Sequence, residues 1–505
     1  MILSGYTLKN IQSPAIEVPP QAIFELPEKV LQFGTGVLLR GLPDYFIDKA
    51  NKNGIFNGRI VVVKSTDGGD AASFDKQDGL YTICVRGVDK GETIEENIVC
   101  ASISRVLSGK NEWDKILECA QNPSLKIIIS NTTEVGIELV NDDINRYPPV
   151  SFPGKLLSFL FARYKAFAGS KDCGMVIVPT ELIVDNGKKL EAIVTELAHL
   201  NGLDDAFMDW LESSNRFCNS LVDRIVPGKP DNTTKAELES MLGYQDELIT
   251  MSEVYRLWAI EGGEEIAKVL SFAEADEGVV IAKNIDLFRE LKLRLLNGTH
   301  TLSSGIAFLC GFSTVKQAMD DSHLSNFIST VMRKDIAPAI PCDADPADAD
   351  AFALKVLDRF RNPGIEHQWL SITVQYSSKM QMRIVPVLLH YYKLFDTVPQ
   401  NIALGFAAYI LFMKPVKEKD GNYFGERNGD HYPIKDDKAS YFYEKWKKTE
   451  PASIARSVLQ DSNFWGQDLF ALPGFADSVQ ENIDDINERG MAMVLKTPAP
   501  QKITV

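Results

Sequence analysis

Short apolar runs alternate with helical patterns along the first third of the chain. Continuous apolar strands separated by helices are typical of a parallel sheet that is covered on both faces. The expected fold class is therefore α/β for this part of the chain. We predict strands at residues 30–33, 59–64, 81–86, 98–106, 126–130 and 175–178, and helices at residues 38–52, 112–120 and 155–168.

The strand pattern fades after about residue 187, and helical periodicity takes its place. Apolar residues recur at helical spacing in segments 191–199, 204–211, 287–296, 354–361 and 402–413. We therefore expect an α/β domain over residues 1–280 and a mostly α-helical domain over residues 281–505.

Two polar segments predict exposed loops. Residues 341–350 (PCDADPADAD) carry four Asp but lack the central Gly and the terminal Glu of a calcium loop, which favours a solvated acidic loop. Residues 417–438 are rich in charge, Gly and Asn, so we expect a surface excursion there, with a lid as the alternative.

Composition and charge narrow the function classes. The chain has 505 residues, 45% hydrophobic and 24% charged, which suits two or three folded domains and argues against global disorder. Its formal net charge of −16 repels nucleic acid and anionic lipid, and no long basic run offsets it. Residues 402–413 are too few to span a bilayer, and the first residues do not resemble a secretory signal. We expect a soluble cytoplasmic protein, a monomer or small homo-oligomer, with neither nucleic-acid nor membrane partners.

The seven cysteines and six histidines form no recognisable metal motif. No C-x-x-C pair and no H-E-x-x-H segment occurs. We predict reduced thiols and no metal ion.

A glycine pair follows the first predicted strand. Gly34-Thr35-Gly36 stands between that strand and a helix, where a dinucleotide fold binds pyrophosphate through its backbone and the helix N-terminus. A third Gly is missing, because position 39 is Leu39, and a plain tight turn is the alternative. The βαβ context favours binding of a dinucleotide cofactor.

Asp67 follows the second predicted strand, where an acid binds the adenosine ribose and repels a 2′-phosphate. We therefore expect NAD rather than NADP as cofactor. Lys64 weakens this inference, because a cation at this position would favour binding of the 2′-phosphate of NADP. The alternative for Asp67 is a turn residue without a role in cofactor binding.

The segment KLRLLNGTH, residues 292–300, combines Lys292, Asn297 and His300 within an apolar stretch. On an α-helix, Asn297 would lie about 140° and His300 about 80° from Lys292, on one broad side. Such a set suits carbonyl reduction: Lys292 donates a proton, Asn297 binds the oxyanion and His300 orients a neighbouring hydroxyl. The alternative is that Lys292 faces solvent and Asn297 ends a helix.

This segment resembles the K-x4-N-x-x-H signature of the mannitol dehydrogenase family, the metal-independent long-chain polyol dehydrogenases. Further blocks match in order along nearly the whole chain: QDGLYT at 77–82, NSLVDRI at 219–225, RFRNP at 359–363 and SSK at 377–379. The segments LQFGTGVLLR, ISNTTEVGI and SLVDRIVPG are most similar to the branch of the family that acts on keto-hexuronates.

The resemblance implies an N-terminal Rossmann-like NAD-binding domain, a helical C-terminal domain and no metal. The family's catalytic Lys, oxyanion Asn and substrate His carry over to Lys292, Asn297 and His300. Its substrate-binding Lys carries over to Lys379. Asn131 and Thr132 match a segment of the cofactor domain and are expected to touch the cofactor, with a structural turn as the alternative.

The chain departs from the polyol enzymes at three positions. The second oxyanion Asn is replaced by Leu182, a Glu three residues before the catalytic Lys by Arg289, and a substrate Arg by Ser371. These changes argue against mannitol and for a carboxylated sugar. We expect Lys379 and Arg383, four residues apart on one helix face, to bind the carboxylate, with Arg289 as a third candidate. The alternative is that Arg383 pairs with a surface acid and Arg289 with Asp286 or Glu290.

The expected activity is NAD-dependent reduction of tagaturonate to altronate. A fructuronate reductase or a mannitol-type polyol dehydrogenase of the same family is the alternative enzyme. A sensor that binds NAD or a sugar acid without catalysis is the alternative outside enzymes, although a sensor needs no proton donor.

Overall fold

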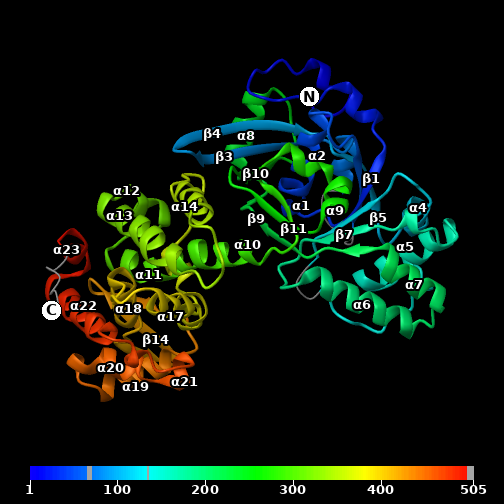
Figure 1. The fold of residues 1–505 in the computed structure, drawn as a ribbon. Coiled ribbons are helices and arrows are strands. Elements are labelled where there is room, and N and C mark those ends of the chain that lie inside the picture. Colours follow the sequence, from blue (N-terminus) through cyan, green and yellow to red (C-terminus); the bar gives the residue numbers. More distant parts are fainter. Residues whose placement is uncertain (65–70, 133–135, 498–505) are drawn as a thin grey trace. The chain divides into compact units, whose positions relative to one another are not determined.

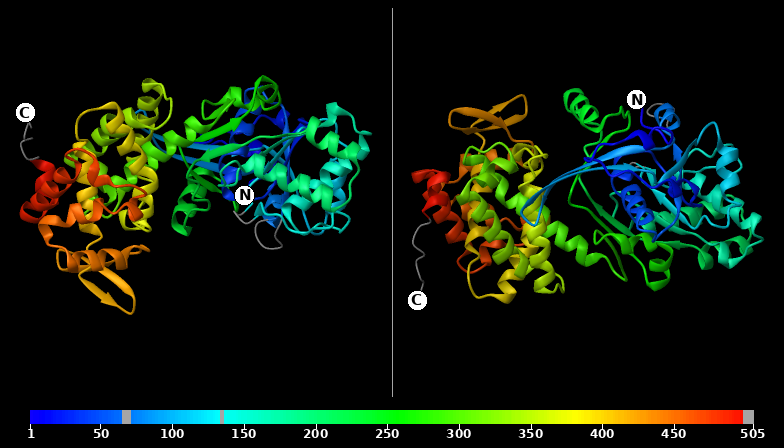
Figure 2. Two further views of the ribbon diagram at one scale, coloured as in Figure 1. Left: turned by 60° about the horizontal axis from the view of Figure 1, so that its bottom comes forward. Right: turned by 90° about the horizontal axis from the view of Figure 1, so that it is seen from above.

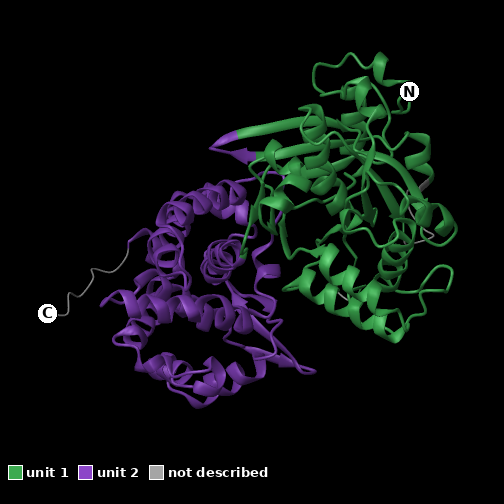
Figure 3. Cartoon of the chain, turned by 45° about the vertical axis from the view of Figure 1, so that its right-hand side comes forward, with its two compact units in different colours: residues 1–87, 93–285 green, residues 88–92, 286–505 purple. Residues whose placement is uncertain are grey.

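The structure is a computed structural model that describes residues 1–64, 71–132 and 136–497. It divides into two compact units, coloured separately in Figure 3. Unit 1 comprises residues 1–87 and 93–285, and unit 2 comprises residues 88–92 and 286–505.

Six parallel strands form the main sheet of unit 1 (Figure 1). In spatial order they are β5 (Ile103–Ser108), β2 (Arg59–Lys64), β1 (Glu28–Phe33), β6 (Ile127–Ser130), β7 (Val176–Pro179) and β8 (Arg216–Phe217). The chain runs outward from β1 to one edge and then returns to build the other half from β6. This is the order of a doubly wound Rossmann sheet, so the predicted α/β class is confirmed.

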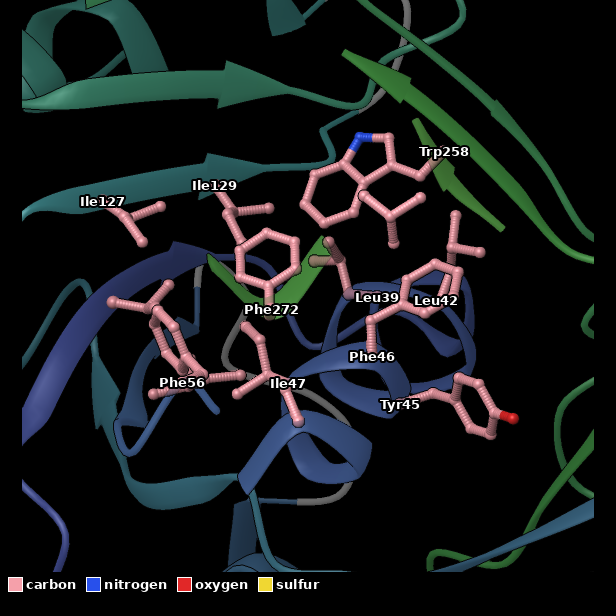
Figure 4. Close-up of a cluster of buried hydrophobic side chains, with 14 of the residues drawn as sticks. Leu39, Leu42, Tyr45, Phe46, Ile47, Phe56, Ile127, Ile129, Trp258 and Phe272 are labelled. Carbon is pink, nitrogen blue, oxygen red and sulfur yellow. The ribbon is translucent and has the colours of Figure 1, made fainter. Parts of the chain in front are cut away.

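Alternate residues of these strands face two different hydrophobic cores. Val62 and Ile129 pack into one core with Trp258 and Phe272, part of which is drawn in Figure 4. Their neighbours along the strands, such as Val61, pack into a second core on the other face. Because both faces are buried, each strand is a continuous apolar run, which is the pattern visible in the sequence.

Helices cover both faces of the main sheet. The helices of unit 1 are α1 (Val37–Gly41), α2 (Pro43–Lys52), α3 (Ala71–Lys76), α4 (Trp113–Cys119), α5 (Phe152–Ala166), α6 (Asn186–Leu200), α7 (Asp205–Ser214), α8 (Asn232–Leu242) and α9 (Glu264–Val269). The single helix predicted over residues 38–52 is two helices. Pro43 at the start of α2 has no N–H to continue the preceding turn, so the chain breaks at Leu42.

Two smaller sheets were incompletely predicted. They are β10 (Thr250–Glu253), β3 (Tyr81–Asp89) and β4 (Glu92–Cys100), and β12 (Val279–Ala282), β11 (Leu257–Glu261) and β9 (Ser220–Asp223). The strand predicted at 98–106 is in fact the end of β4 and the start of β5, which belong to different sheets. The connecting Ala101 and Ser102 are fully buried, so the apolar run hides the turn.

Unit 2 is mostly helical, as predicted. Its α-helices are α10 (Asp286–Leu291), α11 (Thr299–Leu309), α12 (Val315–Asp320), α13 (Ser322–Thr330), α14 (Pro346–Phe360), α15 (Trp369–Ile372), α16 (Tyr376–Lys379), α17 (Val385–Leu394), α18 (Gln400–Phe412), α19 (Ala439–Lys448), α20 (Ile454–Leu459), α21 (Ser462–Trp465), α22 (Phe475–Arg489) and α23 (Met491–Lys496). The buried helices α11 and α18 approach closely, because an added Cβ on Gly305 would lie 3.1 Å from the Ala408 carbonyl oxygen.

Among the described residues of unit 2, three segments are π-helical rather than α-helical: η6 (Lys292–Gly298), η7 (Val331–Ile336) and η9 (Met380–Ile384). A π-helix hydrogen-bonds residue i to residue i+5 and is often found at functional sites. Two of these segments contain predicted site residues: η6 contains Lys292 and Asn297, and η9 contains Arg383.

Both predicted loops of unit 2 contain regular structure. Residues 346–350 begin α14, because Asp345 caps that helix by accepting a hydrogen bond from the Ala347 N–H. Residues 417–438 contain an antiparallel sheet of β13 (Lys417–Lys419), β14 (Asn422–Arg427) and β15 (Asp430–Pro433). Figure 2 shows these strands, in orange, projecting from the helices of unit 2.

Within the described residues, no helix is both long and apolar enough to cross a membrane.

Candidate active site

The loop after β1 lies where the strand order of the main sheet reverses. Gly34 has a φ of +127°, a conformation that favours glycine. A Cβ on Gly34 would lie 2.9 Å from Leu39 Cδ1 and 3.1 Å from the Asn131 carbonyl oxygen. The two halves of the sheet therefore meet closely at this point, which is where open α/β sheets bind their ligands.

Gly36 is exposed, and a Cβ added to it would meet nothing within 4 Å. Its backbone conformation is ordinary, so neither strain nor packing explains a glycine there. A missing side chain beside open space lets a ligand approach the backbone. Together with the parallel strand order, Gly34, partly buried Thr35 and Gly36 fit the pyrophosphate of a dinucleotide.

The side chains of Asn131 and Thr132 are bound within the protein. Asn131 Nδ2 donates to the carbonyl and hydroxyl oxygens of Thr180, at 3.1 and 3.0 Å. The N–H and the hydroxyl of Thr132 donate to Glu181 Oε1, at 2.8 and 3.0 Å. These contacts join the ends of β6 and β7 and support the structural-turn alternative for both residues.

Glu181 is a buried acid that sequence reasoning did not assign to the site. Its carboxylate also accepts a hydrogen bond from the Ser130 hydroxyl, at 3.1 Å. The sequence did contain an indication of this, because an acid two residues after a buried strand lies at the carboxyl edge of the sheet.

Leu182 stands where polyol enzymes have an oxyanion Asn, and its side chain is 64% exposed. The retained Asn186 is fully buried and its amide donates to the carbonyl oxygens of Pro179, Glu181 and Ser220. The part of this segment that matches the family therefore holds the fold together, whereas the position that differs faces solvent.

Asp67 lies outside the described residues. Lys64, at the end of β2, is buried, and its carbonyl oxygen accepts a hydrogen bond from the Gly109 N–H.

Lys292 and Asn297 are the first and sixth residues of the π-helix η6, and His300 follows in α11. The predicted α-helical geometry is wrong for this segment. Because a π-helix brings residues five apart toward the same side, Lys292 and Asn297 lie closer in direction than the 140° of an α-helix. Both side chains are partly buried.

His300 is buried among aromatic rings. Its ring stacks on Phe360 at 4.0 Å between centroids and meets His367 edge-on at 4.9 Å. Burial, with the nearby His367, Arg359 and Arg383, holds the pKa of His300 well below its usual range. The imidazole is therefore neutral at pH 7. In the part of the chain that the structure describes, its buried Nε2 has no hydrogen-bond partner, so it can bind a substrate hydroxyl.

Lys379 and Arg383 lie on α16 and η9. Lys379 Nζ donates a hydrogen bond to the Ile372 carbonyl oxygen at 2.9 Å. Burial lowers the pKa of Lys379, and the nearby positive charge of Arg383 lowers it further. Arg383 Nη1 donates to Thr301 Oγ1 at 3.0 Å and to the Asn297 carbonyl at 3.3 Å. Its buried Nε has no partner within the described ranges. The two cations therefore lie in the same cluster as Asn297.

Arg289, in α10, forms an ion pair with Asp286 at 2.9 Å. This pair is the alternative that the sequence left open for Arg289.

Arg359 and His367 were not assigned to the site from the sequence. Arg359 is at the end of α14, beside Phe360, and His367 lies between α14 and α15. The available signal was the RFRNP block, which places Arg359 one residue before the aromatic ring that stacks on His300.

No group of three or more His, Cys, Asp or Glu side chains among the described residues could hold a metal ion.

Two family descriptions together match most of the chain. Residues 28–272 match the mannitol dehydrogenase Rossmann domain, and residues 284–487 match the mannitol dehydrogenase C-terminal domain.

Relatives named altronate oxidoreductase match nearly end to end. The protein of Halalkalibacterium halodurans is 37% identical over 481 residues, which covers 93% of each chain. That of Bacillus subtilis is 37% identical over 477 residues, covering 94% of this chain and 95% of its own.

Two solved structures share the fold at 21% identity. A substrate-free D-sorbitol dehydrogenase matches with a TM-score of 0.77, covering 98% of this chain and 100% of its own. Pseudomonas fluorescens mannitol 2-dehydrogenase, in a ternary complex with NAD and D-mannitol, matches with a TM-score of 0.62, covering 98% and 99%.

Proposed function

Because the chain belongs to the mannitol dehydrogenase family, we propose that it is an NAD-dependent oxidoreductase that interconverts D-tagaturonate and D-altronate. Reduction consumes one NADH and one proton and converts the ketone to a secondary alcohol. The near-complete match to altronate oxidoreductases supports this substrate pair. Among the contacts in the structure, the observation that carries the proposal is the group of cations around His300, which suits a sugar acid better than a neutral polyol.

The proposed chemistry uses three side chains of η6 and α11. Lys292 donates a proton to the ketone oxygen as negative charge develops there. The Asn297 amide donates a hydrogen bond to the same oxygen and stabilises that charge. His300 is neutral, and its unpartnered Nε2 binds a substrate hydroxyl and fixes the orientation of the sugar.

Residues 1–280 form the cofactor domain in this proposal, with Gly34, Thr35 and Gly36 at the pyrophosphate. Asn131 and Thr132 shape the adjacent end of β6. When bound, NADH supplies the hydride that reduces the ketone carbon. NADH is preferred over NADPH, with Asp67 as the residue that excludes the 2′-phosphate.

Residues 281–505 form the substrate domain. Lys379 and Arg383 bind the carboxylate, Lys379 as a point charge and Arg383 through the part of its guanidinium that is not bound to Asn297 and Thr301. Arg289 is a third candidate, although its pair with Asp286 competes for that role. The enzyme works in the cytoplasm as a monomer or small homo-oligomer.

The test is a substrate panel followed by the absorbance of NADH. The purified protein is mixed with NADH or NADPH and with tagaturonate, fructuronate, fructose or tagatose. Tagaturonate with NADH should give the highest kcat/KM. Faster turnover of fructuronate or fructose would favour the alternative enzymes of the family, and binding of NADH without any turnover would favour a sensor.

A further inference from the structure

His367 lies beside His300 in unit 2. Its ring meets His300 edge-on, with 4.9 Å between centroids and 83° between planes. It also lies near enough to Lys379 and Arg359 for both cations to lower its pKa. One imidazole thus contacts the residue proposed to orient the sugar and lies within electrostatic range of the residue proposed to bind the carboxylate.

The His367 ring is available to a ligand. Its side chain is partly buried, and no hydrogen bond to either ring nitrogen is found within the described residues. A half-buried imidazole that makes no internal hydrogen bond serves the fold only through ring packing. A bound group with an acceptor oxygen would satisfy its N–H.

A neutral ring and cationic side chains act on His367. The neutral His300 ring contacts it from α11, and the cations Arg359, in α14, and Lys379, in α16, lower its pKa. Burial is the largest cause of the lowered His367 pKa, and Arg359 and Lys379 lower it further. The neutral form of His367 is therefore favoured at pH 7. Asp436, the acid that acts on Lys379, offsets part of this positive field. A ligand carboxylate would be attracted to the Lys379 cation, whereas a neutral hydroxymethyl group would not.

From these contacts we infer that His367 selects the sugar acid by donating a ring N–H to the substrate carboxylate, beside Lys379. This inference rests on the proposed function, which supplies the carboxylate, and names a specificity-determining residue that the sequence did not reveal. Since the contact needs no change in charge of the neutral imidazole, it operates at pH 7.

Equilibrium binding tests the inference without turnover. Altronate and altritol differ only in a carboxylate against a hydroxymethyl group, and calorimetry gives Kd for each with the enzyme–NADH complex, in which altronate cannot be oxidised. His367→Leu removes the N–H at similar volume, and His367→Gln retains a donor. His323→Gln, on an exposed turn of α13, is the matched control.

The expected result is at least a tenfold rise in Kd for altronate with His367→Leu, a smaller rise with His367→Gln, and less than a twofold change for altritol. His323→Gln should match the parent. An equal change for both ligands, or no change, would overturn the inference, since ring packing alone does not distinguish them. If His367→Leu does not fold, the comparison of His367→Gln with His323→Gln decides.

A second measurement reads His367 directly. Its C2–H resonance in labelled protein, assigned through His367→Gln, reports the pKa of the ring. Altronate should raise that pKa, because a nearby carboxylate favours the charged imidazolium, and altritol should leave it unchanged. An unchanged pKa with altronate bound would contradict the contact. A parent that binds altronate but does not oxidise it would refute the proposed function and leave the role of His367 standing.

Discussion

Arg294 and Arg383 hold two π-helical segments together. Arg294, in η6, donates through Nη1 to the carbonyl oxygen of Arg383 at 3.0 Å. Arg383, in η9, donates through Nη1 to the carbonyl of Asn297 in η6. Each segment therefore supplies an arginine to the backbone of the other. The proposed catalytic and carboxylate-binding residues are fixed relative to each other by this exchange.

Loss of Arg294 should destabilise the protein and reduce turnover. Arg294→Met leaves the carbonyls of Met382 and Arg383 and the carboxylate of Glu290 without their donor. We expect a loss of about 2–4 kcal/mol in the free energy of unfolding, measured by urea titration. Arg333→Met, which breaks an exposed pair with Asp350, is the control and should cost less than about 1 kcal/mol. Equal losses in the two variants would contradict the role of Arg294.

Lys292→Ala should remove most turnover and leave NADH binding intact. A general acid contributes about 10²–10⁴-fold to the rate. Stopped-flow or steady-state kinetics give kcat, and NADH fluorescence gives Kd. Lys316→Ala, which removes a partly exposed lysine of α12 that pairs with Asp320, should behave like the parent. Activity of Lys292→Ala within a few-fold of the parent would exclude Lys292 as the proton donor.

The two glycines of the β1–α1 loop should respond differently to a methyl group. Gly36→Ala meets open space, so the melting temperature should hold while the Kd for NADH rises at least tenfold. Gly34→Ala forces a positive φ and a contact with the Asn131 backbone, and should cost about 1–3 kcal/mol of stability. Unchanged NADH binding by Gly36→Ala would mean that the cofactor does not approach this loop.

Substitutions of Lys379 and Arg383 should have different effects on the kinetics with a carboxylated and a neutral substrate. Lys379→Met should raise KM for tagaturonate far more than KM for tagatose, its neutral counterpart. Arg383→Met should raise both KM values and lower kcat, because Arg383 also supports the Asn297 backbone. Arg289→Met should affect only tagaturonate if Arg289 leaves Asp286 to bind substrate. No change with Arg289→Met would assign that residue to its ion pair.

The buried Asp44 in α2 should make stability depend on pH. Burial raises its pKa to about 7, against an unfolded value of about 3.9. The native state therefore holds the proton more tightly, and this contribution to stability is lost as pH rises from about 4 through 7, by up to about 1.4 kcal/mol per pH unit. Urea titrations from pH 5 to 8 should give a flatter profile for Asp44→Asn. Asp343→Asn, at an exposed site, should keep the parent's slope.

The main sheet could be predicted because its strands are buried on both faces. Residues 59–64 (RIVVVK) are apolar at the four inner positions and match β2 residue for residue. The strands after residue 187 were harder to predict. β8 has only two residues, and β9 (SLVD) is polar at both ends, whereas the equally short β7 (VIVP) is apolar throughout. The start of α14 was missed for a different reason. The acidic stretch at residues 341–350 was predicted to be a loop, but its Asp345 caps the N-terminus of α14.

The residues of the candidate site were accessible from the sequence, but their geometry was not. Lys292, Asn297 and His300 stand out as polar residues in an apolar run. The contact of His367 with His300 joins residues 67 positions apart, so it depends on how α14 packs against α11. The pairing of Arg383 with Asn297 is equally non-local, and no pattern along the chain reveals it.

The π-helical turn at Lys292–Gly298 explains the spacing of the motif itself. Two side chains that must reach one atom from a regular α-helix are placed three or four positions apart. Here they are five apart, as the wider turn requires. Deleting one residue among Leu293, Leu295 and Leu296 would leave Lys292 and Asn297 four positions apart, the spacing at which an ordinary α-helix keeps two side chains on one side. A lysine and an asparagine five positions apart therefore mark an inserted residue, which the wider turn accommodates at the expense of regular hydrogen bonding while the two groups stay on a common side.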